Sequence, residues 1–241
     1  MRNLRVELIG LRFISIILSI LFFPLSSFAF VFNIPSGDEA ALLSALTLAQ
    51  TNDQDDTINL AAGTYNTSGT TFMYTPDAAE NFDLTLDGAA AGTTILDGGN
   101  ADQVLRIVTT GVTNDSGVAI LIMDLTIQDG MGVFATTDGN GGGFRFSATS
   151  AVLTVQNSAF SNNTTNGDGG GLFSSTAGVA TLTNDTFTNN TAVNPAAGAD
   201  PDGGGAFFNS GPVTITDTDF TNNSADAGGG VGVLNLAGNL I

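Results

Sequence analysis

One repeat constrains the fold of this chain more than any other feature of its sequence. Three segments align on a phenylalanine followed by paired asparagines, LTVQNSAFSNN (153–163), ATLTNDTFTNN (180–190) and VTITDTDFTNN (213–223). A fourth, ILIMDLTIQDG (120–130), fits the same frame with isoleucine in place of phenylalanine. The aligned positions are 127, 160, 187 and 220, so that the successive separations along the chain are 33, 27 and 33. A frame that recurs at such a period indicates a solenoid, in which each coil packs on its neighbours.

Each repeat has the pattern of a short β-coil. Apolar residues stand seven and five positions before the aligned phenylalanine, which predicts a short strand with one face in a core. Stacked coils would place the phenylalanines in an interior ladder, and asparagines at turns tolerate left-handed backbone angles and can form amide ladders. Glycine clusters allow tight corners between strands. The residues that we assign to this structural repeat are Phe160, Asn163, Phe187, Asn190, Phe220, Asn223, Gly170, Gly171, Gly204 and Gly205.

The loop between each paired asparagine and the next glycine cluster varies in length, while the strands keep their frame. The loop is short at 164–168 and long at 191–202. No repeat contains a run with helical periodicity, and Gly, Thr and Asn all disfavour helix. The sequence therefore predicts an all-β fold, a parallel β-helix with variable loops on one side.

The N-terminal segment 1–29 has the pattern of a signal peptide. Arg2, Arg5 and Arg12 precede an apolar run at 13–23, and small residues at positions 27 and 29 fit a cleavage site. The apolar run is shorter than the approximately 20 residues that span a bilayer. We expect export, with residues 30–241 forming the mature domain; the alternative is an uncleaved N-terminal anchor.

The mature domain is expected to begin with a helical cap and to continue through weaker coils. The N-terminal cap is placed at about 33–57, with a helix at 38–50 that opens with a capping box of Ser36 and Glu39. Leu42, Leu43, Leu46 and Ala49 form its apolar face. Short strands follow within 56–65, 82–88, 93–99 and 104–108. The C-terminal end stops before the next aligned phenylalanine, so we expect a truncated solenoid; the alternative is a last coil covered by something else.

The charge of the mature domain restricts its partners. Of five basic residues only Arg106 and Arg145 lie after position 29, against 22 acidic ones (23 less Glu7), which gives 2 − 22 = −20. Such a surface repels nucleic acid and anionic headgroups, so we expect no nucleic-acid partner. No later segment is apolar enough to predict an integral membrane span. The chain has no Cys, so packing and not disulfides must stabilise it.

The repeats resemble those of a known family. GGLF (170–173), GGAF (204–207) and the three Phe-x-x-Asn motifs resemble polymorphic outer membrane protein repeats, across about 120–241. The opening segments GDEAALLSA (37–45) and DTINL (56–60) are similar to the first coil of bacterial proteins with the pectate-lyase-like fold. The resemblance implies a right-handed, single-stranded parallel β-helix. It also implies a place in the cell envelope or on the outer membrane surface, or secretion. GGFR (142–145) and GGVG (229–232) depart from the family pattern, and the family's membrane-anchoring barrel is absent from the sequence.

Enzymes of that fold offer the main alternative function. Lyases need clustered carboxylates that hold Ca²⁺ and an Arg or Lys that takes a proton, for which Arg106 and Arg145 are the candidates. The alternation Leu105-Arg106-Ile107 points Arg106 outward, and a solvated arginine paired with a local Asp accounts for either residue. Hydrolases need paired carboxylates, but Asp55-Asp56 is the one adjacent Asp pair and lies in the cap region. There is no His or Cys to build a nucleophile–base pair. We assign no catalytic residue, and the sequence favours a protein that is not an enzyme.

A metal site has weak candidates. Asp97 and Asp102, and Asp200 and Asp202, place carboxylates in turns, which suits Ca²⁺. The same residues serve turn geometry without a metal. We therefore expect no cofactor, with Ca²⁺ as the alternative.

The sequence thus supports a non-catalytic, adhesin-like or structural β-helix that contacts surface glycans or cell-surface proteins. The alternative is a polysaccharide-active enzyme or carbohydrate-binding β-helix. An ice-binding face would need a regular array, which the unequal separations of 33, 27 and 33 do not provide.

Overall fold

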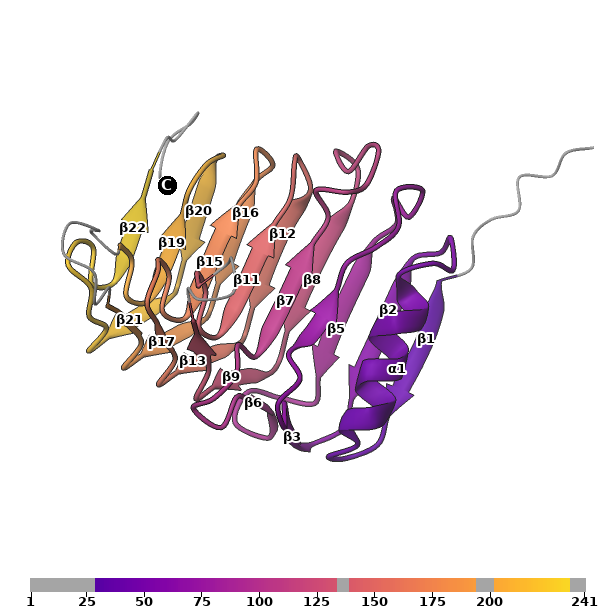
Figure 1. Ribbon diagram of the computed structural model, residues 1–241, viewed down its shortest axis with the longest axis horizontal. Helices are drawn as coiled ribbons and strands as arrows, with labels where there is room; N and C mark the ends of the chain where they lie inside the picture. The colour runs from indigo at the N-terminus through magenta and orange to yellow at the C-terminus, as the bar shows by residue number, and fades with distance from the viewer. Residues whose placement is uncertain (1–28, 134–138, 194–201, 235–241) are drawn as a thin grey trace, which may run out of the picture.

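The computed structural model describes residues 29–133, 139–193 and 202–234, and in these ranges the chain winds into a right-handed parallel β-helix with one helix at its N-terminal end (Figure 1). Successive strands of the chain pass from one sheet to the next, and strands of successive coils pair in parallel. Four sheets, which we name A to D, run along the solenoid axis in this part of the chain.

Sheets A and B hold the repeat frame. Sheet A contains β1 (Phe30–Ile34), β2 (Asp56–Leu60), β5 (Leu84–Gly88), β8 (Ala119–Met123), β12 (Val152–Gln156), β16 (Ala180–Thr183) and β20 (Val213–Thr216). Sheet B contains β3 (Gly63–Asn66), β6 (Thr94–Asp97), β9 (Thr126–Gln128), β13 (Ala159–Ser161), β17 (Thr186–Thr188) and β21 (Asp219–Thr221).

Sheets C and D complete each coil. Sheet C contains β4 (Phe72–Tyr74), β7 (Leu105–Val108), β11 (Phe144–Ser147), β15 (Leu172–Ser175), β19 (Ala206–Phe208) and β22 (Val231–Val233). Sheet D is the short set β10 (Met131–Gly132), β14 (Thr164–Thr165) and β18 (Thr191–Ala192).

The register of the strands confirms the repeat frame. Ile127, Phe160, Phe187 and Phe220 are register partners from coil to coil, and the ladder continues upstream through Leu96. The rings of Phe160 and Phe187 stack at 4.5 Å with 2° between their planes, and those of Phe187 and Phe220 at 4.8 Å with 13°. This spacing matches the distance between hydrogen-bonded strands, so one packing contact repeats in each coil.

The repeat has two kinds of Asp or Asn position, one with a left-handed backbone and one with an inward side chain. The Asp or Asn three residues before each aligned position has a positive φ of 50° to 57°, at Asp124, Asn157, Asn184 and Asp217. The asparagine three residues after it points inward instead: Asn163 donates to Asn190 Oδ1 at 2.9 Å, and Asn190 to Asn223 Oδ1 at 3.0 Å. The interior amide ladder thus stands apart from the left-handed positions, which carry an exposed ladder of their own where Asn184 donates to Asn157 Oδ1 at 2.9 Å.

The glycine clusters turn the chain where coils touch. The first glycine of each cluster has a φ of 60° to 71°, at Gly141, Gly169, Gly203 and Gly228. The second has no room for a side chain, because a Cβ on Gly170 would lie 2.4 Å from the carbonyl oxygen of Gly204. Gly170, Gly171, Gly204 and Gly205 therefore have an architectural role.

Helix α1 (Glu39–Ala49) packs against β4, β1 and β2 at the N-terminal end of the solenoid (Figure 1). Its buried residues are Leu42, Ala45, Leu46 and Ala49. The predicted capping box was wrong: the N-cap is Asp38, whose Oδ1 accepts from the amide of Ala41 at 2.9 Å, while Glu39 Oε1 accepts from the amide of Asn66. Strand β1 was not predicted, and the expected single strand at 56–65 is two strands, β2 and β3.

Candidate binding groove

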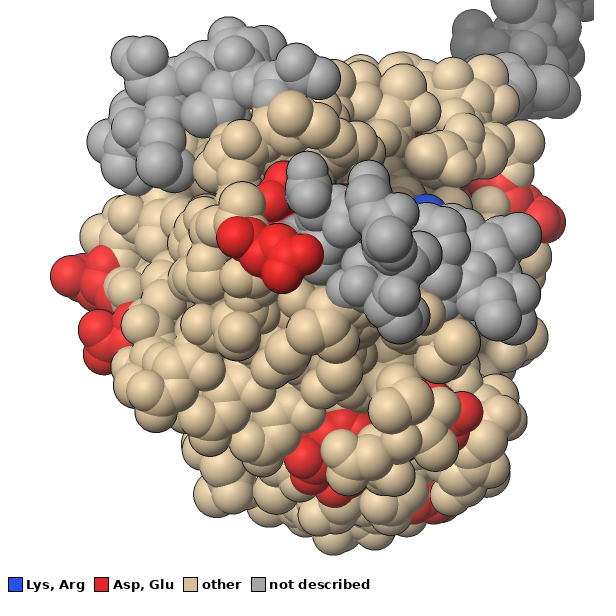
Figure 2. Space-filling view, turned by 60° about the vertical axis from the view of Figure 1, so that its left-hand side comes forward, with Lys and Arg blue, Asp and Glu red and all other residues tan. Residues whose placement is uncertain are grey.

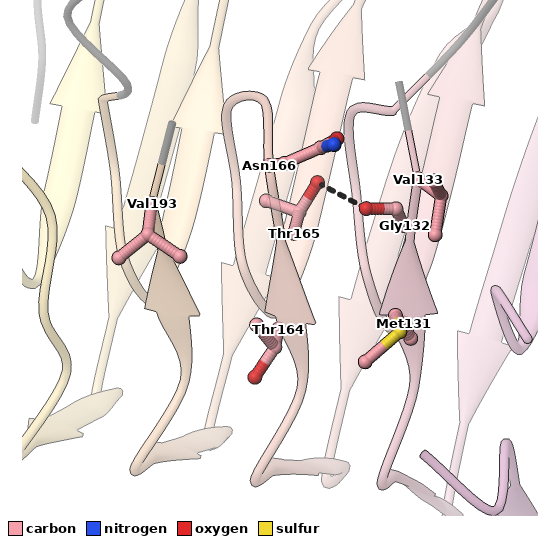
Figure 3. A pocket seen from close by; sticks show the side chains of 7 residues that line it. All are labelled: Met131, Gly132, Val133, Thr164, Thr165, Asn166 and Val193. Atoms are coloured by element: carbon pink, nitrogen blue, oxygen red, sulfur yellow. Dashed lines mark hydrogen bonds between the residues drawn. The ribbon is translucent and has the colours of Figure 1, made fainter. Parts of the chain in front are cut away.

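Two adjoining hollows form a groove along sheet D. One has a volume of about 280 Å³ and is lined by Met131, Gly132, Val133, Thr164, Thr165, Asn166 and Val193 (Figure 3). The other, of about 350 Å³, is lined by Thr71, Met73, Ala101, Asp102, Gln103, Arg106, Met131, Gly132 and Val133. Because Met131, Gly132 and Val133 line both, the hollows are continuous across successive coils. We call these residues together the axial groove.

The groove has an apolar floor. Met73, Met131, Val133 and Val193 are each between 36% and 48% exposed, and they come from three different parts of the chain. Thr165 lies in the wall, where its hydroxyl donates to the carbonyl oxygen of Gly132 (Figure 3). Exposed apolar side chains that gather in a hollow with a polar rim are typical of a contact surface.

Arg106 lines this groove, and Arg145 lies next to it on the adjacent strand of sheet C. Arg106 and Arg145 are register partners on β7 and β11, and Met73 and Phe173 continue the same outward row. Both therefore point outward, as the alternation predicted. Arg145 Nε donates to Ser147 Oγ at 3.1 Å, and its guanidinium carbon lies 5.8 Å from the centre of the Phe173 ring. Phe173 in turn stacks on Phe207 at 6.0 Å.

This pair of cations is set in an acidic surface. In the face that Figure 2 shows, acidic atoms gather in several separate patches, and one small basic spot is visible. Neighbouring strands are about 4.8 Å apart, so the two arginines start from adjacent positions on the same face of sheet C. An apolar floor beside a cation pair is suited to binding a ligand that has both an apolar part and an anionic group.

Two of the predicted Ca²⁺ candidates, Asp97 and Asp102, accept hydrogen bonds from neighbouring turns. Asp97 Oδ1 accepts from the amide of Gly99 and its Oδ2 from Gln128 Nε2, both at 2.8 Å. Asp102 Oδ2 accepts from Thr67 Oγ1 and from the amide of Gly69, also at 2.8 Å. Both line one hollow of about 330 Å³. Asp202 lies elsewhere, where its amide donates to Asp168 Oδ1, and Asp200 lies outside the described residues. Within the described ranges, no three Asp, Glu, His or Cys side chains converge on one point.

Several buried acids were missed by the sequence analysis. Asp185, 1% exposed, accepts from the amides of Ser158 and Thr183, and burial raises its pKa to about 7. Asp115 accepts from the amides of Thr149 and Ser150 and from Thr109 Oγ1. Asp56 and Glu80 are buried beside α1. The burial of Asp56 could have been predicted, because alternate residues of a strand share a face and Ile58 and Leu60 on that face are apolar.

The groove lining itself offers few groups for acid–base chemistry. Asp102 is its acidic residue and Arg106 its basic one, and Asp102 is occupied by Thr67 and Gly69. The remaining lining is apolar, amide, hydroxyl or glycine. The geometry is therefore suited to binding.

Comparison of the chain with protein-family models, with curated proteins and with solved structures finds no match. Over the described part of the chain, no helix has the length and apolarity needed to cross a bilayer.

Proposed function

We propose that this chain is an exported, non-catalytic β-helix of adhesin or passenger type that binds a surface glycan or a cell-surface protein through its axial groove. The observation that carries the proposal is the groove itself, with its apolar floor from Met73 to Val193 beside the Arg106–Arg145 pair. The repeat's resemblance to polymorphic outer membrane proteins and the leader-like segment 1–29 support a place on the cell surface, in the envelope or in the medium.

The solenoid supports this use because its architecture separates scaffold from contact surface. Interior ladders and glycine corners fix the coils, so the outward row and sheet D can change without loss of register. Rigid elements that hold exposed side chains are well suited to recognition, since little conformational freedom is lost on binding.

The proposal is tested by binding of the purified protein to intact cells and to immobilised neutral and acidic polysaccharides. We expect Met131→Glu and Met73→Glu to weaken binding at least tenfold, because each places a carboxylate on the apolar floor. The matched control is Val179→Glu, which alters a side chain of similar exposure (38%) outside the groove lining. Equal loss in all three variants, or binding unaffected by either groove variant, would contradict a role for the groove.

A second function, action on an acidic polysaccharide, is favoured by the register of Arg106 and Arg145. Paired guanidinium groups bind carboxylates, and an arginine is the base of lyases with this kind of fold. Assays for unsaturated products and new reducing ends on pectin and alginate, with and without Ca²⁺, distinguish the two functions. Turnover that falls in Arg106→Ala or Arg145→Ala would replace the non-catalytic proposal with the enzymatic one.

A further inference from the structure

Two buried carboxyl groups, of Asp56 and Glu80, are bound by the adjacent residues Asn52 and Asp53, just after the end of α1 and away from the axial groove. Asp56 opens β2 and is 2% exposed, and its side chain shares the inward phase of Ile58 and Leu60. Its Oδ1 accepts from Asn52 Nδ2 at 2.8 Å. Its Oδ2 is buried and has no hydrogen-bond partner among the described residues.

Glu80 meets Asp56 from the segment between β4 and β5. It is 1% exposed, and its Oε2 accepts from the amide of Asp53 at 2.9 Å. Its Oε1, like Asp56 Oδ2, is buried without a hydrogen-bond partner in the described part of the chain. Burial and the charge of Asp56 raise the pKa of Glu80, and burial and the charges of Glu80 and Asp56 raise the pKa of Tyr74. Because Asn52 and Asp53 are neighbours in the chain, the two carboxyl groups that they bind lie close together.

The groups around this cluster add negative charge. Asp53, Asp55 and Asp83 act on it electrostatically, and all three are acidic. Arg106 is paired with Met73 on β7 and β4, and since alternate residues of a strand face opposite sides, it lies across the sheet from Tyr74. A buried carboxylate without a cationic partner is strongly unfavourable, and two that face each other are more so. Protons or a bound cation must therefore neutralise the pair.

We propose that Asp56 Oδ2 and Glu80 Oε1 bind a divalent cation, Ca²⁺ in an exported protein, and that this ion joins β2 to the β4–β5 segment under the cap. In the described residues no third acidic side chain converges on the same point, so main-chain carbonyl oxygens and water complete the shell. Two carboxylates give a weak site, with a dissociation constant of about 0.1–1 mM, which is the range of extracellular Ca²⁺ modules.

Terbium luminescence tests this site directly. Tb³⁺ replaces Ca²⁺ and emits when a nearby tyrosine is excited; the chain has no Trp and two Tyr. We expect sensitised emission that Ca²⁺ displaces, that Tyr74→Phe removes and that Tyr65→Phe preserves. Tyr65 is the matched control because its hydroxyl binds the carbonyl oxygens of Pro35 and Ala61. Asp56→Asn and Glu80→Gln should abolish the signal, whereas Asp102→Asn should retain it.

Thermal unfolding at constant ionic strength is the second measurement. Ca²⁺ at about ten times its dissociation constant should raise the midpoint of the wild-type protein by roughly 3–5 °C. This measurement needs no variant, so it decides the question even if Asp56→Asn fails to fold. Emission that survives Tyr74→Phe would place the ion elsewhere. A midpoint that does not rise with Ca²⁺ would overturn the proposal.

Discussion

At the scale of single residues, the inward asparagine of each repeat has every polar atom paired. Asn190 Oδ1 accepts from the amide and the side chain of Asn163, and its Nδ2 donates to the carbonyl oxygen of Phe160 and to Asn223 Oδ1. Asn190 is fully buried, so no water replaces these bonds. A buried network of this kind stabilises only while it is complete.

Asn190→Ala should therefore destabilise the protein by about 3–5 kcal/mol, because it leaves several buried donors and acceptors without partners. Urea unfolding followed by circular dichroism measures this change. The control is Asn184→Gly, which removes an exposed ladder bond to Asn157 but keeps the freedom for the positive φ at that position. If the two variants lose similar stability, the interior ladder contributes no more than the exterior one.

Asp185 makes the stability depend on pH. Burial raises its pKa from 3.8 to about 7, so the folded state favours the protonated form. The stabilisation is complete below about pH 4, where unfolded and folded states are both protonated, and is lost as pH rises towards 7. We expect the free energy of unfolding to fall by about 2–4 kcal/mol over this range on account of Asp185.

Asp185→Asn should flatten the profile between pH 5 and pH 8 when unfolding is measured at each pH. Asp219→Asn, which removes an exposed charge, should leave the wild-type slope in place. An unchanged slope in the Asp185 variant would assign the pH dependence to other groups.

At the scale of secondary-structure elements, α1 buries one apolar face and exposes the other, as its sequence predicts. Leu46 is 1% exposed and Leu48 is 59% exposed, although both lie in the same turn of the same helix. Because α1 packs on β1, β2 and β4, its buried face stabilises the first coil.

Leu46→Ala should destabilise the cap by about 2–5 kcal/mol, and Leu48→Ala should have little effect. In a solenoid each coil depends on its nearest neighbours, so the loss should remain local. Hydrogen exchange should show lower protection in α1, β1 and β2 but not in β12 or β16. Uniform loss of protection along the chain would instead indicate one cooperative unit.

The elements that the sequence predicted are those that repeat. These are the Phe ladder, the turns at Asp124 and Asn157, and the glycine corners. Because they recur in a fixed frame, the sequence alone predicts them. The N-cap Asp38 was not predicted, because Ser36 and Glu39 also match a capping-box motif. Glu39 instead accepts a hydrogen bond from the amide of Asn66, and Asp38 caps the helix.

The candidate site was less predictable than the fold. The axial groove joins Met73, Arg106, Met131 and Val193, which are far apart in sequence and become neighbours only once the loop lengths set the register. Likewise, nothing near Glu80 in the sequence indicates that it meets Asp56.

At the scale of the whole molecule, the high negative charge opposes compaction. Residues 30–241 have a net charge of 2 − 22 = −20, and Asp217 and Asp219 lie on the outside of the coils. Self-repulsion of this size is screened by salt, since the Debye length falls from about 30 Å at 0.01 M to about 3 Å at 1 M.

The unfolding midpoint should therefore rise by several degrees between about 0.01 M and 1 M NaCl, as scanning calorimetry measures. KCl should have the same effect, because screening does not depend on the identity of a monovalent cation. A midpoint that falls, or that differs between the two salts, would mean that specific ion binding outweighs screening.

The pairing of strands between coils also determines how the molecule responds to force. The hydrogen bonds between β12 and β16, or β16 and β20, run along the solenoid axis, so tension between its ends loads one coil boundary at a time. The coils that end at Phe187 and Phe220 contain 27 and 33 residues, and each would lengthen the chain by roughly 90–110 Å once released. Under load the protein should extend in discrete steps of unequal length, and each step would leave the remaining coils intact.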